Sequence, residues 1–229
     1  MKTNTLIKLK TFLVILVAAT VCGCLGPRRI DKWIASEYGP TTTLNKNKSD
    51  YINITSPLIT GDEVSSKSTK KTRHFLPLLF YWKCDYRVSS TLNSKIPINT
   101  FTSAFTNYAN SKGVRQKLNG SKVEISIDKI PVSFSFNDDE TVVYLVFFYV
   151  DNQKIYWLPE KQEMVLTYKI INSNAAVKTG VINIPDPNKT EKPRFFESAK
   201  RATSEYLSHY DDNIRAMAKM AVDKLIADL

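Results

Sequence analysis

Strict alternation of apolar and polar positions predicts two strands in the middle of the chain. In "KVEISID", residues 122–128, every second side chain is apolar, and in "PVSFSF" the apolar positions are Val132, Phe134 and Phe136. Such a period of two is typical of a strand with one buried face. The aromatic and branched stretch "FLPLLFYWKCDYRVSSTLN", which begins at Phe75, also predicts a strand. Its shared face would consist of Trp82, Cys84, Tyr86 and Val88.

A helical period appears at two places. "NTFTSAFTNYANSKG" carries an apolar stripe formed by Phe101, Ala104, Phe105, Tyr108 and Ala109. Asn99 or Thr100 can cap this helix, and Gly113 is a stop signal. A long C-terminal helix is expected from Pro193 to about Ala227, with a stripe at Ile214, Met217, Ala218, Ala221 and Leu225. Asp211-Asp212 either interrupts this helix or begins a second one.

The run "TVVYLVFFYV", residues 141–150, lacks polar alternation and predicts a central strand covered on both faces. "NDDE" before it and "DNQK" after it are interpreted as turns, and "KIYWL" as the partner strand of a hairpin. "MVLTYKII" and "VKTGVINI" predict a further pair of strands. The aromatic residues concentrated around the hairpin are Phe147, Phe148, Tyr149, Tyr156 and Trp157. We expect the segment Tyr144–Trp157 to be core, the alternative being an apolar groove for an acyl chain or a partner's helix.

Together these elements predict an α+β fold. Short connections favour antiparallel pairing, and a sheet with an apolar face must bury it against helices. We therefore expect a single α+β domain over residues 75–229. Its curved, mostly antiparallel sheet would carry an internal helix and a long C-terminal helix, packed mainly on one face.

The first residues have the order of a signal peptide. Lys2, Lys8 and Lys10 precede an uncharged stretch of 11 residues, Thr11–Val21. That stretch is too short for a membrane-spanning helix, which needs about 20 residues, but it has the length of a signal-peptide h-region. A short buried helix is the alternative.

The two cysteines that follow decide between these alternatives. Val21-Cys22-Gly23-Cys24 resembles the lipobox of bacterial lipoproteins, with Cys22 standing where Ala or Ser is more usual. The resemblance implies a lipid on the thiol of Cys24, cleavage between Gly23 and Cys24, and acylation of the new amine, for example with palmitate. The expected organisation is then a signal peptide over 1–23, a lipidated, flexible tether over 24–74, and the domain.

Other uses of the cysteines have less support. A zinc site needs about four ligands, whereas the chain has three Cys and two isolated His, His74 and His209. A disulfide framework needs an even number of cysteines, and cleavage would leave Cys84 beside the modified Cys24. We expect Cys84 to be a small buried apolar residue.

Charge and motifs exclude several classes of function. Removal of the leader takes the formal net charge from +10 to +7. Behind a secretory leader this positive charge favours anionic lipid head groups over nucleic acid, or reflects no specific partner. The basic run Lys67, Lys70, Lys71 and Arg73 is interpreted as a solvated loop, the alternative being a contact to phosphate-bearing lipid or to a cell-wall polymer. The glycines, seven in all, form no phosphate-binding loop, so no cofactor is expected.

No catalytic site is expected either. The only Cys/His combinations outside the leader join Cys84 to His74 or His209, and neither surrounding sequence has a peptidase signature. Paired carboxylates occur at Asp62-Glu63, Asp138-Asp139-Glu140 and Asp211-Asp212. Each is interpreted as turn or capping chemistry rather than as an acid–base pair or a metal site.

The expected function is that of a non-enzymatic lipoprotein of the cell envelope, held by its N-terminal lipid and binding a protein partner or an envelope component. The layout is loosely similar to that of auxiliary lipoproteins of envelope transport systems. Leu25 after the lipidated cysteine, where Asp retains many lipoproteins in the inner membrane, indicates the outer membrane, facing the periplasm. The alternative is an envelope hydrolase acting on cell wall or lipid. It would require a cleft that gathers Cys84, His74 and a carboxylate.

Overall fold

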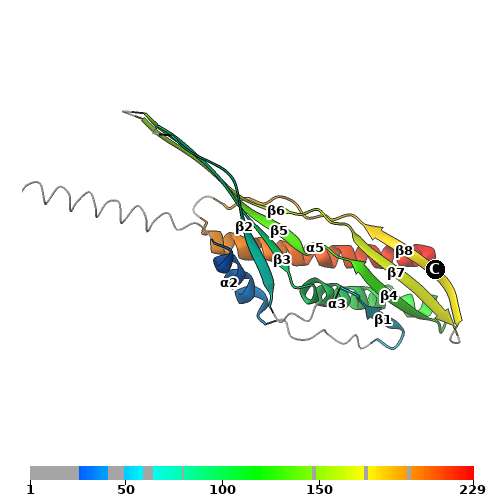
Figure 1. Ribbon diagram of the computed structural model, residues 1–229. Helices are drawn as coiled ribbons and strands as arrows, with labels where there is room; N and C mark the ends of the chain where they lie inside the picture. The colour runs from blue at the N-terminus through cyan, green and yellow to red at the C-terminus, as the bar shows by residue number, and fades with distance from the viewer. Residues whose placement is uncertain are drawn as a thin grey trace, which may run out of the picture.

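The computed structural model describes residues 26–40, 49–58, 64–78, 80–145, 148–172, 175–194 and 197–229. Within these residues the strands form two four-stranded sheets, accompanied by four helices. The α+β class, the mostly antiparallel pairing and the long C-terminal helix are confirmed. Figure 1 shows a body made of helices and one sheet, from which the strands of the other sheet project.

The first sheet lies within the body and has the strand order β1-β4-β7-β8. Its members are β1 (Ile52–Thr55), β4 (Lys122–Lys129), β7 (Met164–Asn172) and β8 (Ala175–Ile184). β1 is parallel to β4, and the other pairs are antiparallel. The alternation predicted for residues 122–128 is confirmed, because Val123, Ile125 and Ile127 are buried between exposed or half-buried neighbours.

The second sheet has the order β2-β3-β5-β6, and all its pairs are antiparallel. Its members are β2 (Ser66–Leu78), β3 (Tyr81–Leu92), β5 (Ser133–Leu145) and β6 (Phe148–Pro159). One end of this sheet packs on the helices, and the other end extends away from the body as a narrow ribbon (Figure 1). We call this four-stranded projection the ribbon.

The helices α3 (Lys95–Ser111) and α5 (Ala199–Asp228) pack against each other and against the first sheet; α4 (Val114–Lys117) follows α3. α5 is continuous through Asp211-Asp212, and every residue of its predicted stripe is buried. Its first turn is capped by the Ser198 hydroxyl, which accepts from the amide of Arg201, so the helix begins later than Pro193. α3 begins earlier than predicted, at Lys95, and ends just before Gly113, whose φ is +67°.

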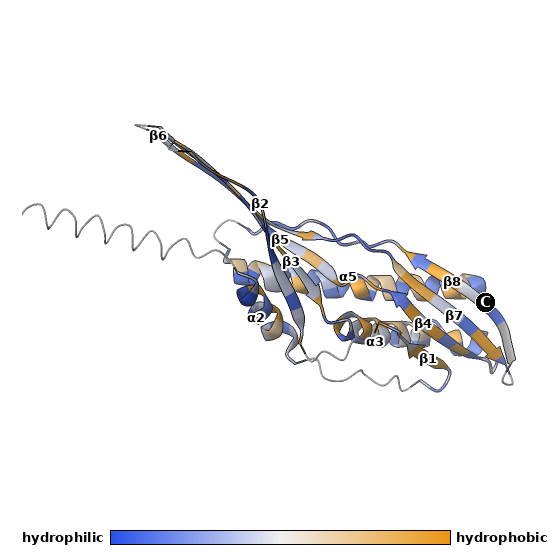
Figure 2. Cartoon of the chain, in the orientation of Figure 1, coloured by the Kyte–Doolittle hydropathy of each residue, from blue (hydrophilic) through white to orange (hydrophobic). Residues whose placement is uncertain are grey.

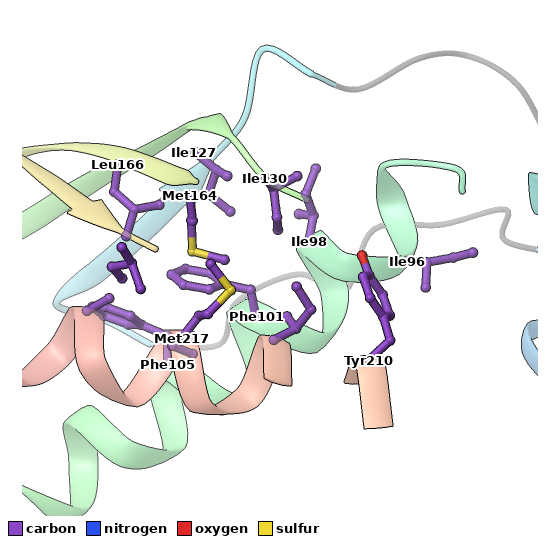
Figure 3. Close-up of a cluster of buried hydrophobic side chains, with 14 of the residues drawn as sticks. Ile96, Ile98, Phe101, Phe105, Ile127, Ile130, Met164, Leu166, Tyr210 and Met217 are labelled. Carbon is purple, nitrogen blue, oxygen red and sulfur yellow. The ribbon is translucent and has the colours of Figure 1, made fainter. Parts of the chain in front are cut away.

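The core joins these helices to the first sheet. Figure 3 shows Phe101 and Phe105 of α3 pointing toward Met164 and Leu166 of β7 and Met217 of α5. At the base of the ribbon, the rings of Phe134 and Tyr206 lie 4.9 Å apart, which ties β5 to α5. The C-terminal half of α5 lies on β8, where the amine of Lys224 donates to the carbonyl of Asn183 (2.7 Å). α5 therefore connects the two sheets.

Residues before Phe75 also belong to the packed body. α2 (Pro27–Tyr38) buries Ile30 and Ile34 completely. The carboxylate of Asp31 accepts hydrogen bonds from the hydroxyls of Ser66 and Ser68 on β2, at 2.8 and 2.6 Å. The packed structure thus extends further toward the N-terminus than the expected domain start, because the apolar side of α2 finds a surface on the ribbon base and on α5.

Several local predictions around the ribbon are wrong. "NDDE" and "DNQK" are not turns but the middle of β5 and β6, where Asp139 lies opposite Lys154 and Glu140 opposite Gln153. The basic run from Lys67 to Arg73 is not a loop but part of β2. The apolar run 141–150 is not one central strand, since β5 ends at Leu145 and β6 begins at Phe148.

Candidate functional site at the end of the ribbon

The polar middle of the ribbon, which we call the stalk, separates the body from the outer end. It comprises residues 70–74 of β2, 83–87 of β3, 137–141 of β5 and 151–156 of β6, which are predominantly charged or polar. Cross-strand bonds hold it together: the amide of Gln153 donates to Asp138 (2.9 Å), and the hydroxyl of Tyr156 donates to Asp139 (3.0 Å). In Figure 2 the stalk is mostly blue, with orange segments toward the end of the ribbon.

Beyond the stalk the strands carry apolar residues, and the side chains that the structure describes there are exposed or half-buried; we call this part of the ribbon the tip. It comprises residues 75–78 and 80–82 of the first hairpin and 142–145 and 148–150 of the second. The relative exposure is 71% for Phe148, 62% for Tyr149, and 55% for both Tyr144 and Phe80. Isolated exposed apolar residues are normal on a protein surface, but a contiguous group of large ones marks an interaction site.

The two hairpins form one continuous tip. Tyr81 lies opposite Val143 across the β3–β5 pair, and the amide of Tyr144 donates to the carbonyl of Phe80 at 2.9 Å. On one face, the rings of Phe75 and Trp82 meet edge to face, with centroids 4.8 Å apart. The opposite face carries Tyr81 and Val143. The tip is thus apolar on both of its faces.

One strand face shows how the core gives way to the tip. Val88, Tyr86, Cys84 and Trp82 share a face of β3, as predicted. Val88 is fully buried, Tyr86 is nearly so, Cys84 is half-buried, and Trp82 is 42% exposed. Burial is lost along the strand because the helices that cover this face end before it does.

The two faces of the stalk differ in charge. Asp138, Glu140 and Asp151 occupy one face, where burial raises the pKa of Asp138 and Glu140, and the charge of Asp151 adds to both shifts. The other face holds a polar hollow of about 300 Å³, lined among others by Arg73, Lys83, Asp85, Arg87, Asp139 and Lys154. Lys83 pairs with Asp85 (3.5 Å) and Arg87 with Glu160 (3.4 Å). Lys83 is thus paired within the hollow, and Arg87 is paired with a carboxylate beyond its lining.

The residues weighed for catalysis are not brought together. His74 lies opposite Asp85, while Cys84 lies opposite Phe75 and Glu140. Because neighbouring residues of a strand point to opposite faces, Cys84 is on the other side of the sheet from His74 and Asp85. Cys84 packs against the core, as expected, but it is half-buried rather than buried. His209 is on α5, 3.0 Å from the Glu191 carboxylate.

The other paired carboxylates form no metal site among the described residues. Asp211-Asp212 lies within α5, and Asp62-Glu63 lies outside the described residues. Across the described part of the chain, no cluster of His, Cys, Asp and Glu could hold a metal ion. None of the described helices combines the length and apolarity needed to cross a membrane. Cys22, Gly23 and Cys24 also lie outside the described residues, so lipidation at Cys24 stays a prediction.

The comparisons found no family model, no curated protein and no solved structure that matches the chain.

The tip is the candidate functional feature that the sequence interpretation missed. Phe148, Tyr149 and Tyr144 were assigned to the core, and this assignment is wrong, whereas Trp157, at 1% exposure, is core as predicted. The sequence signal that identifies the tip is a pattern that both hairpins share. In each hairpin an uncharged, mostly apolar segment lies between charged residues: residues 75–82 lie between Arg73 and Lys83, and residues 141–150 between Glu140 and Asp151.

Proposed function

We propose that this protein is a non-enzymatic, lipid-anchored protein of the cell envelope that binds an envelope component through the tip of its ribbon. The observation that carries the proposal is the raised apolar tip: large aromatic side chains stay exposed at the end of a polar stalk. Keeping such residues in water is unfavourable, so they have a value to the protein only when something covers them.

The lipobox-like segment supports the membrane part of the proposal. Cys24 precedes α2 by three residues, and α2 is bonded to the ribbon base through Asp31. A lipid at Cys24 would therefore hold the ribbon, and not only a remote tether, close to a membrane. One acyl chain gives marginal binding, and stable anchoring takes two signals; the three chains of a mature bacterial lipoprotein satisfy this. Location in the outer membrane, facing the periplasm, remains part of the proposal.

The test uses the full chain and its Cys24→Ser variant, expressed in a bacterium. We expect the wild type to fractionate with membranes and its mature N-terminal peptide to begin at Cys24 with added acyl mass. Cys24→Ser should accumulate as unlipidated precursor, because cleavage follows the modification. Cys22→Ser is the matched control and should be processed like the wild type. An N-terminal peptide that begins at Cys24 without acyl mass would refute the anchor.

Binding through the tip is tested separately, with Phe80→Ser, Phe148→Ser and Tyr149→Ser combined in one chain. A control chain carries Val64→Ser and Val181→Ser, which replace residues of similar exposure away from the tip. We expect the tip variant, but not the control, to lose the envelope components that can be cross-linked to the wild type. Equal cross-linking of all three chains would place the binding surface elsewhere.

A further inference from the structure

We propose that the occupant of the tip is a lipid bilayer: the tip inserts into one leaflet of the membrane that carries the Cys24 lipid. The inference deepens the proposed function and rests on it for the position of the anchor. Its first support is that both faces of the tip are apolar, with Phe75 and Trp82 on one face and Tyr81 and Val143 on the other. Lipid surrounds an inserted element on all sides, so apolar side chains on both faces fit insertion into a bilayer.

The composition of the tip fits an interfacial depth. Residues 75–82 and 141–150 contain no charged side chain. They include Trp82 and the tyrosines Tyr81, Tyr144 and Tyr149, which are the residue types enriched where a bilayer meets water. The ring of such a residue sits among lipid while its polar atom remains hydrated. Charged residues resume at Arg73, Lys83 and Asp151, on the side of the tip toward the body.

The length of the apolar segments limits the depth to one leaflet. About four residues per strand, at about 3.3 Å each, give an apolar height of roughly 13 Å. A strand that spans a bilayer needs about 9–11 residues. The outer edges of β2 and β6 have no neighbouring strand among the described elements. Unpaired backbone groups are not tolerated in hydrocarbon, so the tip stays near the hydrated interface, and Pro77 removes one N–H from the β2 edge.

The geometry lets the tip and the lipid enter the same bilayer. α2 lies at the end of the body from which the ribbon projects (Figure 1). Leu78 is ten residues beyond Ser68, the partner of Asp31, which gives about 33 Å along β2. Three residues and one helical turn separate Cys24 from Asp31, and a chain of this length reaches at most about 17 Å. With Cys24 at the membrane surface, Asp31 stands at most about 17 Å above it. A ribbon that runs from there back to the membrane, tilted by roughly 35° or more from the membrane normal, then places its tip about 10 Å below the surface, a typical interfacial depth.

The experiment uses the full lipidated chain with the photoreactive residue p-benzoylphenylalanine at position 148, reconstituted in vesicles of phosphatidylethanolamine and phosphatidylglycerol. We expect illumination to attach phospholipid to position 148 in well-dispersed vesicles. Position 181 is the control: Val181 is 60% exposed on β8, away from the tip, and should give little or no lipid adduct. When Phe80→Ser and Tyr149→Ser are combined with the label at position 148, the lipid adduct at that position should also decrease, because the tip has lost two of its aromatic side chains.

Three results would overturn the inference. A cross-link to a second copy of the chain would assign the tip to self-association. Lipid adducts that appear only when the vesicles cluster would assign the tip to an opposing membrane. Equal adducts at positions 148 and 181 would mean that the tip does not insert. The N-terminal mass measurement is independent of these results, so failure of the lipid anchor and failure of tip insertion are distinguishable.

Discussion

The backbone amide of Tyr144 donates a hydrogen bond to the carbonyl of Phe80 across 2.9 Å. This bond joins the outer end of β5 to the turn between β2 and β3, so the two hairpins end at the same level. An isolated two-stranded hairpin is marginally stable in water, whereas four paired strands can carry an exposed apolar end. The arrangement explains how side chains that would ordinarily form a core are held in solvent.

The first prediction concerns two aromatic residues of β5 that share a face. Tyr144→Asp should change the free energy of unfolding by only about 0.5 kcal/mol, the usual range for exposed positions. Phe136 lies eight residues earlier and is fully buried. Phe136→Asp should prevent folding, because an unpaired buried carboxylate costs several kcal/mol. Thermal unfolding followed by circular dichroism distinguishes the two variants. Loss of folding in both would mean that the tip is packed in solution.

The second prediction concerns Gly180, which lies opposite Tyr168 across the β7–β8 pair. A Cβ at position 180 would come within 2.5 Å of the Tyr168 ring. Gly180→Ala should therefore destabilise the protein by about 1–3 kcal/mol, the typical cost of overpacking. Urea unfolding gives the measurement, with Thr179→Ala as the control on the same strand. The loss should shrink when Tyr168→Ala is added, because the two residues are in contact; additive effects would contradict the steric explanation.

The body of this fold could be predicted from the sequence because burial and period agree there. The stripe of α5 and the alternation of β4 face a core on one side and solvent on the other, and this contrast is what periodicity records. Gly113 was identified as a stop because a positive φ favours glycine.

The ribbon could not be predicted in the same way. An apolar run such as residues 141–150 indicates that its side chains avoid water, but not what covers them. The covering layer was assumed to be this chain, and the structure provides none at Tyr144 or Phe148. The charged groups at 137–140 and 151–154 were interpreted as turns because acids favour turns. In the structure the two groups lie opposite each other across the β5–β6 pair, where the amide of Gln153 donates to Asp138.

The third prediction tests the link between α2 and the ribbon. Asp31→Ala removes the acceptor of the Ser66 and Ser68 hydroxyls, and Ser66 is buried. Loss of hydrogen bonds to a charged acceptor should reduce the free energy of unfolding by about 2 kcal/mol. Lys32→Ala, the neighbouring exposed position, is the control and should have little effect. Amide hydrogen exchange of β2 should increase in Asp31→Ala only; unchanged exchange would mean that α2 does not brace the ribbon.

The last prediction concerns pH and the contact between α2 and α5. The hydroxyl of Tyr38 donates to the carboxylate of Asp211 at 3.3 Å. Burial raises the pKa of Asp211 to about 6, a shift opposed by Arg215 and by the Tyr38 hydrogen bond and increased by Asp212 and Glu37. Burial also raises the pKa of Tyr38, so its hydroxyl keeps the proton that it donates.

A raised pKa in the folded state means that folding favours protonated Asp211. Its contribution to stability is fully present below the unfolded pKa of about 3.9 and is lost as the pH rises through about 6. Asp211→Asn keeps an acceptor for Tyr38 without the charge. After allowance for solvent screening, it should be more stable than the wild type by about 1 kcal/mol at pH 7, and the difference should vanish near pH 4. Urea unfolding of both proteins between pH 4 and 7 measures the difference between their free energies of unfolding. The other carboxyl groups are common to both proteins, so their titration cancels in this difference. A stability difference that stays constant with pH would show that Asp211 does not titrate between pH 4 and 7. The charge of its carboxylate would then not be the cause of the difference.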